Sequence, residues 1–187
     1  ISCSLVGSEM CIRDRYKCNR LQRKSGRCSA DVLDRKIVVE YALNYALVPN
    51  IGSEDDFWFF VQDGTNFVSQ CWYTGGIKQN SGWHWQNRKH HTKSWTDMKK
   101  FVQYMTKYSA YYSDNNKPVA RICRDKNSVQ IGDLIQFRNN ADIWYKLAII
   151  TEIKNSEIYY VQHSPNCLEH RLSEDNVKEF RFICAKN

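Results

Sequence analysis

The order of the hydrophobic patterns constrains the fold of this chain more than any other feature. Apolar residues recur three and four positions apart over Asp34–Val48, Gly64–Gly76 and Ser94–Tyr108, which predicts amphipathic helices. From about Val129 the chain contains short β-branched and aromatic runs separated by turn residues, namely IGDLIQFR, IWYKLAIITEI, SEIYYVQH and EFRFICA. These runs predict antiparallel strands. Helices followed by strands predict an α+β fold, with N-terminal helices packed on a C-terminal antiparallel β-sheet.

The first part of the chain divides into segments of different composition. Ser4–Arg15 (SLVGSEMCIRDR) is similar to a translated sequencing adapter, so we expect residues 1–15 to be foreign to the fold. Residues 16–33 form a basic N-terminal segment, and residues 34–187 are long enough for one domain with a sizeable core. The natural N-terminus would then be missing, which leaves the compartment open between the cytoplasm and a secreted or cell-surface location.

The net charge of the chain is +7, which is compatible with an anionic partner such as nucleic acid or an acidic cell-wall polymer. Part of this charge lies in the basic run Lys17–Arg27, which contains no aromatic side chain that could stack on bases. Nucleic acid is therefore disfavoured as a partner. No run of about 18 apolar residues occurs, so we expect no membrane-spanning helix.

Six cysteines follow residue 15, and none of them forms a CxxC pair, which argues against a zinc ribbon or a redox motif. Their scattered positions are typical of buried thiols and favour a reducing compartment. The loop that contains Trp83-His84-Trp85 and His90-His91 lacks a matching set of cysteines or carboxylates. We therefore expect neither a metal nor a cofactor.

The segment Gln62–Gly76 (QDGTNFVSQCWYTGG) predicts a helix that begins directly after the N-cap residue Asp63. A helix N-terminus stabilises a thiolate and lowers its pKa, which suits a cysteine nucleophile. Gly64, the first helical residue, has no side chain. Cys71 lies two turns further along on the apolar stripe, so we expect a buried thiol there and not a substitute nucleophile.

Seven features share their order and spacing with one family of bacterial proteins. They are EYALNYA in the first predicted helix, D-x-TNFVSQCxYxGG at Asp63–Gly76, SWT at Ser94–Thr96, GDLIQF at Gly132–Phe137, IW…IIT at Ile143–Thr151, His163, and FRFI at Phe180–Ile183. Together, over residues 34–184, they resemble the Putative amidase domain family, a relative of the CHAP and NlpC-type cysteine peptidases. The resemblance implies a papain-like, NlpC-like form of the α+β fold. It also implies hydrolysis of an amide bond in a peptide or cell-wall peptide by a cysteine and a histidine.

The resemblance also assigns positions to the catalytic groups. The family's cysteine follows the aspartate of D-x-TNFVSQ, so its position is Gly64 in this chain. Its histidine base corresponds to Lys146, within Trp144–Leu147, and its third polar residue corresponds to His163. Because the nucleophile and the base are both replaced, we expect a pseudoenzyme that has kept the fold as a binding domain.

A binding domain derived from an amidase is expected to bind a peptide or cell-wall peptide. The sequence leaves the oligomeric state open. We expect an aromatic rim and the start of the helix to contact that ligand, through Trp72, Trp83, Trp85, Trp144, Asp63 and Asn66. Two alternatives stay open at this point. One is an active amidase or peptidase with an unrecognised nucleophile, and the other is a basic nucleic-acid-binding module driven by the positive charge.

Overall fold

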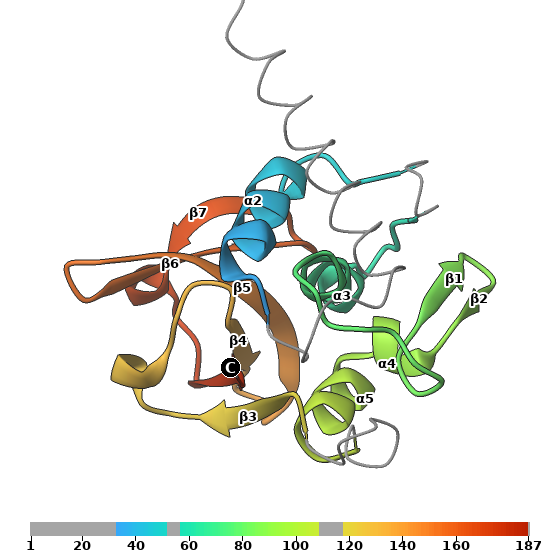
Figure 1. The fold of residues 1–187 in the computed structure, drawn as a ribbon. Coiled ribbons are helices and arrows are strands. Elements are labelled where there is room, and N and C mark those ends of the chain that lie inside the picture. Colours follow the sequence, from blue (N-terminus) through green and yellow to red (C-terminus); the bar gives the residue numbers. More distant parts are fainter. Residues whose placement is uncertain (1–32, 52–56, 109–117, 187) are drawn as a thin grey trace, which may run out of the picture. The chain divides into compact units, whose positions relative to one another are not determined.

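The computed structural model describes residues 33–51, 57–108 and 118–186, in which helices come first and a sheet follows (Figure 1). The adapter-like segment 1–15 and the basic segment 16–33, apart from Leu33, lie outside the described residues. The predicted α+β class is confirmed by the helices and the six-stranded antiparallel sheet. No helix in the described ranges is both long and apolar enough to cross a membrane.

Two helices follow the sequence pattern closely. Helix α2 (Arg35–Tyr45) starts after Asp34, whose carboxylate accepts a hydrogen bond from the backbone N–H of Ile37 at 3.2 Å. Helix α3 (Gly64–Thr74) stops at Gly75, whose backbone N–H donates to the carbonyl of Cys71. Amphipathic spacing and local capping therefore define both helices.

The single helix predicted to begin at Ser94 is instead two short helices. Helix α4 (Lys93–Thr96) is separated from α5 (Met98–Gln103) by Asp97, which has an extended backbone. The Asp97 carboxylate accepts from the backbone N–H of Lys100 at 2.8 Å and so caps α5. The Ser94 hydroxyl donates to the Gly82 carbonyl and does not cap a helix. A π-helical turn, Tyr104–Tyr108, follows α5.

The main sheet has the strand order β3-β8-β4-β5-β6-β7, with antiparallel pairing throughout. The four predicted runs correspond to β4, β5, β6 and β8, whereas β3, β7 and the separate hairpin β1–β2 were not predicted. The strands are β1 (Trp85–Asn87), β2 (His90–His91), β3 (Ala120–Cys123), β4 (Leu134–Arg138), β5 (Trp144–Lys154), β6 (Glu157–Gln162), β7 (Cys167–Arg171) and β8 (Glu179–Ala185).

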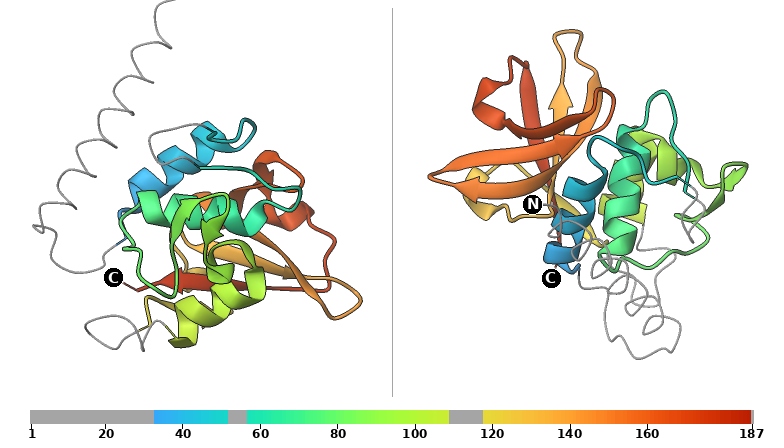
Figure 2. Two further views of the ribbon diagram at one scale, coloured as in Figure 1. Left: turned by 90° about the vertical axis from the view of Figure 1, so that its right-hand side faces the viewer. Right: turned by 90° about the horizontal axis from the view of Figure 1, so that it is seen from above.

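The two faces of the sheet have different partners. One face carries a buried cluster that includes Phe137, Ala148, Ile150 and Tyr160 and contains no residue of α2 to α5. Because side chains alternate along a strand, Leu147 points to the opposite face. The view from above in Figure 2 shows α2 and α3 beside the sheet, on one side of it.

A buried ion pair joins the helices to the sheet. The Arg35 guanidinium of α2 lies 2.7 Å from the carboxylate of Asp133, just before β4. Next to it, Gly132 has a φ of +82°, and a Cβ at this position would lie 3.4 Å from the Cα of Arg35. Glycine therefore allows both the backbone conformation and the close approach of α2.

Candidate functional site

Helix α3 begins at Gly64, as predicted, but the Asp63 side chain does not cap it. Asp63 precedes Gly64 as expected, yet its side chain accepts no hydrogen bond from the helix backbone. Its Oδ1 atom instead accepts from the backbone N–H of Phe60 and from the Asn66 side-chain amide, both at 2.8 Å. The Asp63 carboxylate thus bonds the preceding loop and the Asn66 side chain, and it does not cap the backbone N–H groups of α3.

His163 lies against the helix start and is held at both ring nitrogens. Its Nδ1 atom is 2.7 Å from Asp63 Oδ2, and its Nε2 atom is 2.7 Å from the carbonyl oxygen of Tyr45. The ring stacks on Phe67 with a centroid separation of 3.9 Å, and His163 is only 3% exposed. Because a carbonyl only accepts, Nε2 must carry a hydrogen.

The contact with Asp63 occupies the other nitrogen. Either Nδ1 donates to the carboxylate as part of an imidazolium, or a protonated Asp63 donates to the Nδ1 lone pair. Neither arrangement leaves a ring nitrogen free to accept a proton from a nucleophile. His163 is therefore a positioned, fully engaged side chain in this structure.

Two backbone carbonyl groups, one in β5 and one just after β6, lie close to position 64. A Cβ atom at Gly64 would lie 3.3 Å from the carbonyl oxygen of His163 and 3.8 Å from that of Leu147. No other heavy atom of the described residues, apart from chain neighbours and the helix backbone, comes within 4 Å. The structure therefore brings Gly64, Asp63 and His163 together.

Lys146 lies elsewhere. Its Nζ atom is 4.0 Å from the ring centroid of Phe137, 3.3 Å from Tyr160 Oη and 3.5 Å from Asp175 Oδ1. Phe137 and Tyr160 belong to the cluster on the sheet face that contains no residue of α2 to α5. Burial lowers the pKa of Lys146, and the Asp175 carboxylate opposes this shift. The structure thus places the Lys146 side chain on the opposite face of the sheet from α3.

Other nucleophilic groups near α3 are buried or bonded to backbone. Cys71 has no exposed surface, as expected for a core thiol, and burial raises its pKa. The Ser69 hydroxyl donates to the carbonyl of Trp95, and the Ser164 hydroxyl donates to that of Val61. Within the described part of the chain, no hydrogen bond joins Cys71, Ser69 or Ser164 to a histidine or lysine side chain.

The expectation of an exposed aromatic rim is wrong for three of its four tryptophans. Trp72 and Trp83 have no exposed surface, and Trp85 is 6% exposed. Their indoles pack beneath the surface because an aromatic cluster joins α3 to the hairpin, with Trp83 and Trp95 stacked at 4.7 Å. Trp144 alone of the four is half-buried.

Asn66 also has an internal role. It has no exposed surface, and its amide nitrogen donates to the Trp58 carbonyl at 2.7 Å and to Asp63 at 2.8 Å. Its amide oxygen accepts from the indole N–H of Trp95 at 2.9 Å. Asn66 therefore fixes the loop before α3 and has little capacity left for a ligand.

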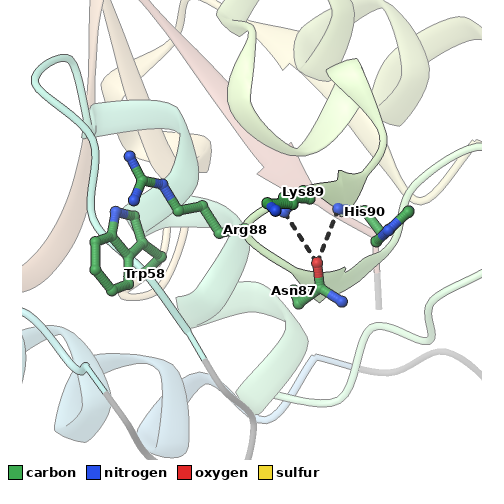
Figure 3. Close-up of a pocket in the computed structure, with 5 residues that line it drawn as sticks. All are labelled: Trp58, Asn87, Arg88, Lys89 and His90. Carbon is green, nitrogen blue, oxygen red and sulfur yellow. Dashed lines mark hydrogen bonds between the residues drawn. The ribbon is translucent and has the colours of Figure 1, made fainter.

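An open hollow of about 420 Å³ lies at the tip of the β1–β2 hairpin and was not foreseen from the sequence (Figure 3). The Arg88 guanidinium is 4.6 Å from the Trp58 ring centroid on one side of the hollow. Asn87 Oδ1 accepts from the backbone N–H groups of Lys89 and His90 at 2.9 and 3.0 Å, which shapes the tip. Only the fold brings Trp58 next to the hairpin, so no local motif could have revealed the hollow.

The fold and this site define a class of protein: an α+β domain in which the start of a helix meets a histidine at the end of a strand. The chain matches the family model described as "Putative amidase domain" over residues 32–183. It therefore belongs to the Putative amidase domain family. No curated protein and no solved structure matches the chain.

Proposed function

We propose that this chain is an amidase-like domain that lacks cysteine-dependent hydrolysis and binds a peptide or cell-wall peptide. One observation carries the proposal. Gly64, at the start of α3, has no side chain that could act as a nucleophile. The two ring nitrogens of the neighbouring His163 are hydrogen-bonded to Asp63 and to the Tyr45 carbonyl. A thiol protease needs a thiolate and a base within about 3 Å of it, and neither is available at this position.

Hydrolysis tests the catalytic half of the proposal. We expect no turnover of fluorogenic peptide amides or of a muropeptide by the chain itself. A Gly64→Cys variant is expected to gain a thiol that is alkylated faster than buried Cys71, because the helix N-terminus stabilises its thiolate. It is expected to remain without turnover, since the nearest imidazole cannot accept its proton.

The controls separate reactivity from catalysis. A Cys123→Ser background removes a competing thiol, because the Ser128 hydroxyl lowers the pKa of Cys123. Mass-spectrometric mapping then assigns each alkylated cysteine. Adding Lys146→His to Gly64→Cys is expected to change nothing, since residue 146 points to the opposite sheet face. Turnover by the unmodified chain would contradict the proposal, whereas turnover by the double variant would contradict the placement of residue 146 on the opposite sheet face.

Two half-buried side chains on the sheet face that α3 covers, Arg181 and Trp144, support the binding half. Leu147, whose carbonyl approaches position 64, is paired with Gln136, and Gln136 is paired with Arg181. Paired residues share a sheet face, so all three lie on the face that α3 covers. The Arg181 Nε–H donates to Gln136 at 2.8 Å, and its guanidinium lies 4.0 Å from the Trp144 ring centroid. A cation on an aromatic ring suits a peptide carboxylate and its neighbouring apolar group.

Calorimetric titration with a cell-wall stem peptide that has a free carboxylate tests this surface. We expect Arg181→Gln to weaken binding by about tenfold or more, because charge-assisted hydrogen bonds contribute more than neutral ones. Arg171→Gln is the matched control, since Arg171 lies on β7 and pairs with Glu174. Absence of binding at millimolar peptide, or equal affinity of the two variants, would contradict the binding role.

A further inference from the structure

The positive charge of the described residues is concentrated in one segment. Residues 77–108 contain seven Lys and Arg residues and a single acidic residue, Asp97. All other described residues together carry twelve Lys and Arg and twelve Asp and Glu. We name this segment, which contains β1, β2, α4 and α5, the basic lobe. Its cations are Lys78, Arg88, Lys89, Lys93, Lys99, Lys100 and Lys107.

The cations of the basic lobe are exposed, and none of them forms an ion pair with a described residue. The carboxylate of Asp97 caps α5 through the backbone of Lys100. Elsewhere in the described residues positive and negative charges are equal in number, and some of them form pairs, as Arg138 does with Glu179 and Lys178 with Asp142. Clustered cations that have no described countercharge attract a polyanion, and binding is favoured because the polyanion then releases its condensed counterions.

Accessible aromatic rings lie beside these cations. Trp58 is half-buried and forms one wall of the hollow at the hairpin tip, with Arg88 over its ring (Figure 3). Phe59 is 44% exposed, and its ring lies at 17° to that of Trp58. Unpaired bases stack on aromatic rings and on arginine planes. A hollow of about 420 Å³ has room for one such base, whereas the bases of a duplex are already stacked on each other.

We propose that the basic lobe and Trp58 bind single-stranded nucleic acid, with a base stacked at Trp58 and Arg88 and phosphates on the surrounding cations. This function is independent of the peptide site at α3. It revises the expectation from sequence, which disfavoured nucleic acid because the basic run at residues 17–27 contains no aromatic side chain. The reason for the revision is that the fold places the rings of Trp58 and Phe59 beside the cations of the basic lobe.

Fluorescence anisotropy with labelled single strands of about 20 nucleotides, oligo-dT and oligo-U, tests the proposal between about 50 and about 200 mM salt. The logarithm of the affinity is expected to fall linearly with the logarithm of the salt concentration. Arg88→Ala/Lys89→Ala is expected to weaken binding about tenfold or more and to reduce the slope by about 1.4, at about 0.7 per phosphate contact. Trp58→Ala is expected to weaken binding about tenfold with little change in slope.

Matched controls separate specific contacts from net charge. The double variant Lys154→Ala/Lys186→Ala also removes two positive charges, but from described residues outside the basic lobe, where positive and negative charges are equal in number. It is expected to preserve the affinity. Circular dichroism verifies that each variant is folded. Three results would each overturn the proposal: no binding at about 50 mM salt, equal binding of an abasic strand, or equally effective competition by polyglutamate. The last result would identify an acidic polymer without bases as the partner.

Discussion

At the scale of single residues, the pair of His163 and Asp63 determines what the start of α3 can do. The two side chains are 3% and 6% exposed and lie 2.7 Å apart. A histidine buried between a carboxylate and a carbonyl stabilises the junction of α2, α3 and β6, because each of its polar atoms has a partner. The same contacts withhold the ring from proton transfer.

Removing the imidazole is expected to destabilise the domain strongly. His163→Ala leaves the Asp63 carboxylate buried without this partner and removes the ring that packs on Phe67. A loss of about 3–5 kcal/mol in the free energy of unfolding is expected for a broken buried pair, measured by urea denaturation. Lys178→Ala breaks an exposed pair with Asp142 and serves as the control, with an expected loss below about 1 kcal/mol.

The double variant Asp63→Asn/His163→Leu gives an independent check on the pair. Residues in one hydrogen-bonded network are energetically coupled, so the double variant is expected to lose less stability than the two single changes combined. A His163→Ala loss no larger than that of Lys178→Ala, or strict additivity in the double variant, would show that the pair does not stabilise the fold.

At the scale of elements, side-chain alternation along β5 decides which residues can meet α3. Lys146 pairs with Phe137, and Leu147 pairs with Gln136. The Lys146 ammonium contacts the Phe137 ring, the Tyr160 hydroxyl and the Asp175 carboxylate. These contacts hold its side chain on the sheet face opposite to α3. A sequence motif gives the position of a residue along a strand, but the face depends on the pairing register.

Local sequence patterns explain which helices and strands could be predicted. Helices α2 and α3 were predictable because each has an amphipathic stripe and local start or stop residues. Strands β3 (ARIC) and β7 (CLEHR) were missed because charged side chains on these edge strands obscure the strand pattern. The α4–α5 division was missed because Asp97 starts a second helix inside one continuous apolar pattern.

The candidate site was predictable only in part. The segment around Gly64 and the order of the family motifs identified the start of α3, and the structure places His163 beside it. Burial of Trp83 and Trp85 could not be foreseen, because their partners in the aromatic cluster come from distant parts of the chain. The same applies to Trp58 and the hairpin tip, which only tertiary packing brings together.

At the scale of the whole molecule, the carboxylate of Asp133 connects helix α2 with two parts of the sheet. Asp133 is 1% exposed and accepts from Arg35 of α2 at 2.7 Å. It also accepts from the backbone N–H groups of Gln130 at 2.9 Å and Ala185 at 3.0 Å. Asp133 therefore joins α2, the turn before β4 and the end of β8, and its charge balances a guanidinium that is only 14% exposed.

Asp133→Asn is expected to loosen α2 from the sheet, because the amide keeps the shape of the carboxylate but removes the negative charge that faces the Arg35 guanidinium at 2.7 Å. The expected loss is about 3–5 kcal/mol in the free energy of unfolding. Hydrogen exchange is expected to be faster in the amides of α2 than in those of β5 and β6, since the ion pair holds the helix and not the central strands. Asp142→Asn, at an exposed carboxylate, is the matched control and is expected to leave exchange in α2 unchanged. If Asp133→Asn accelerates exchange equally in all elements, the carboxylate stabilises the domain globally and does not specifically attach α2.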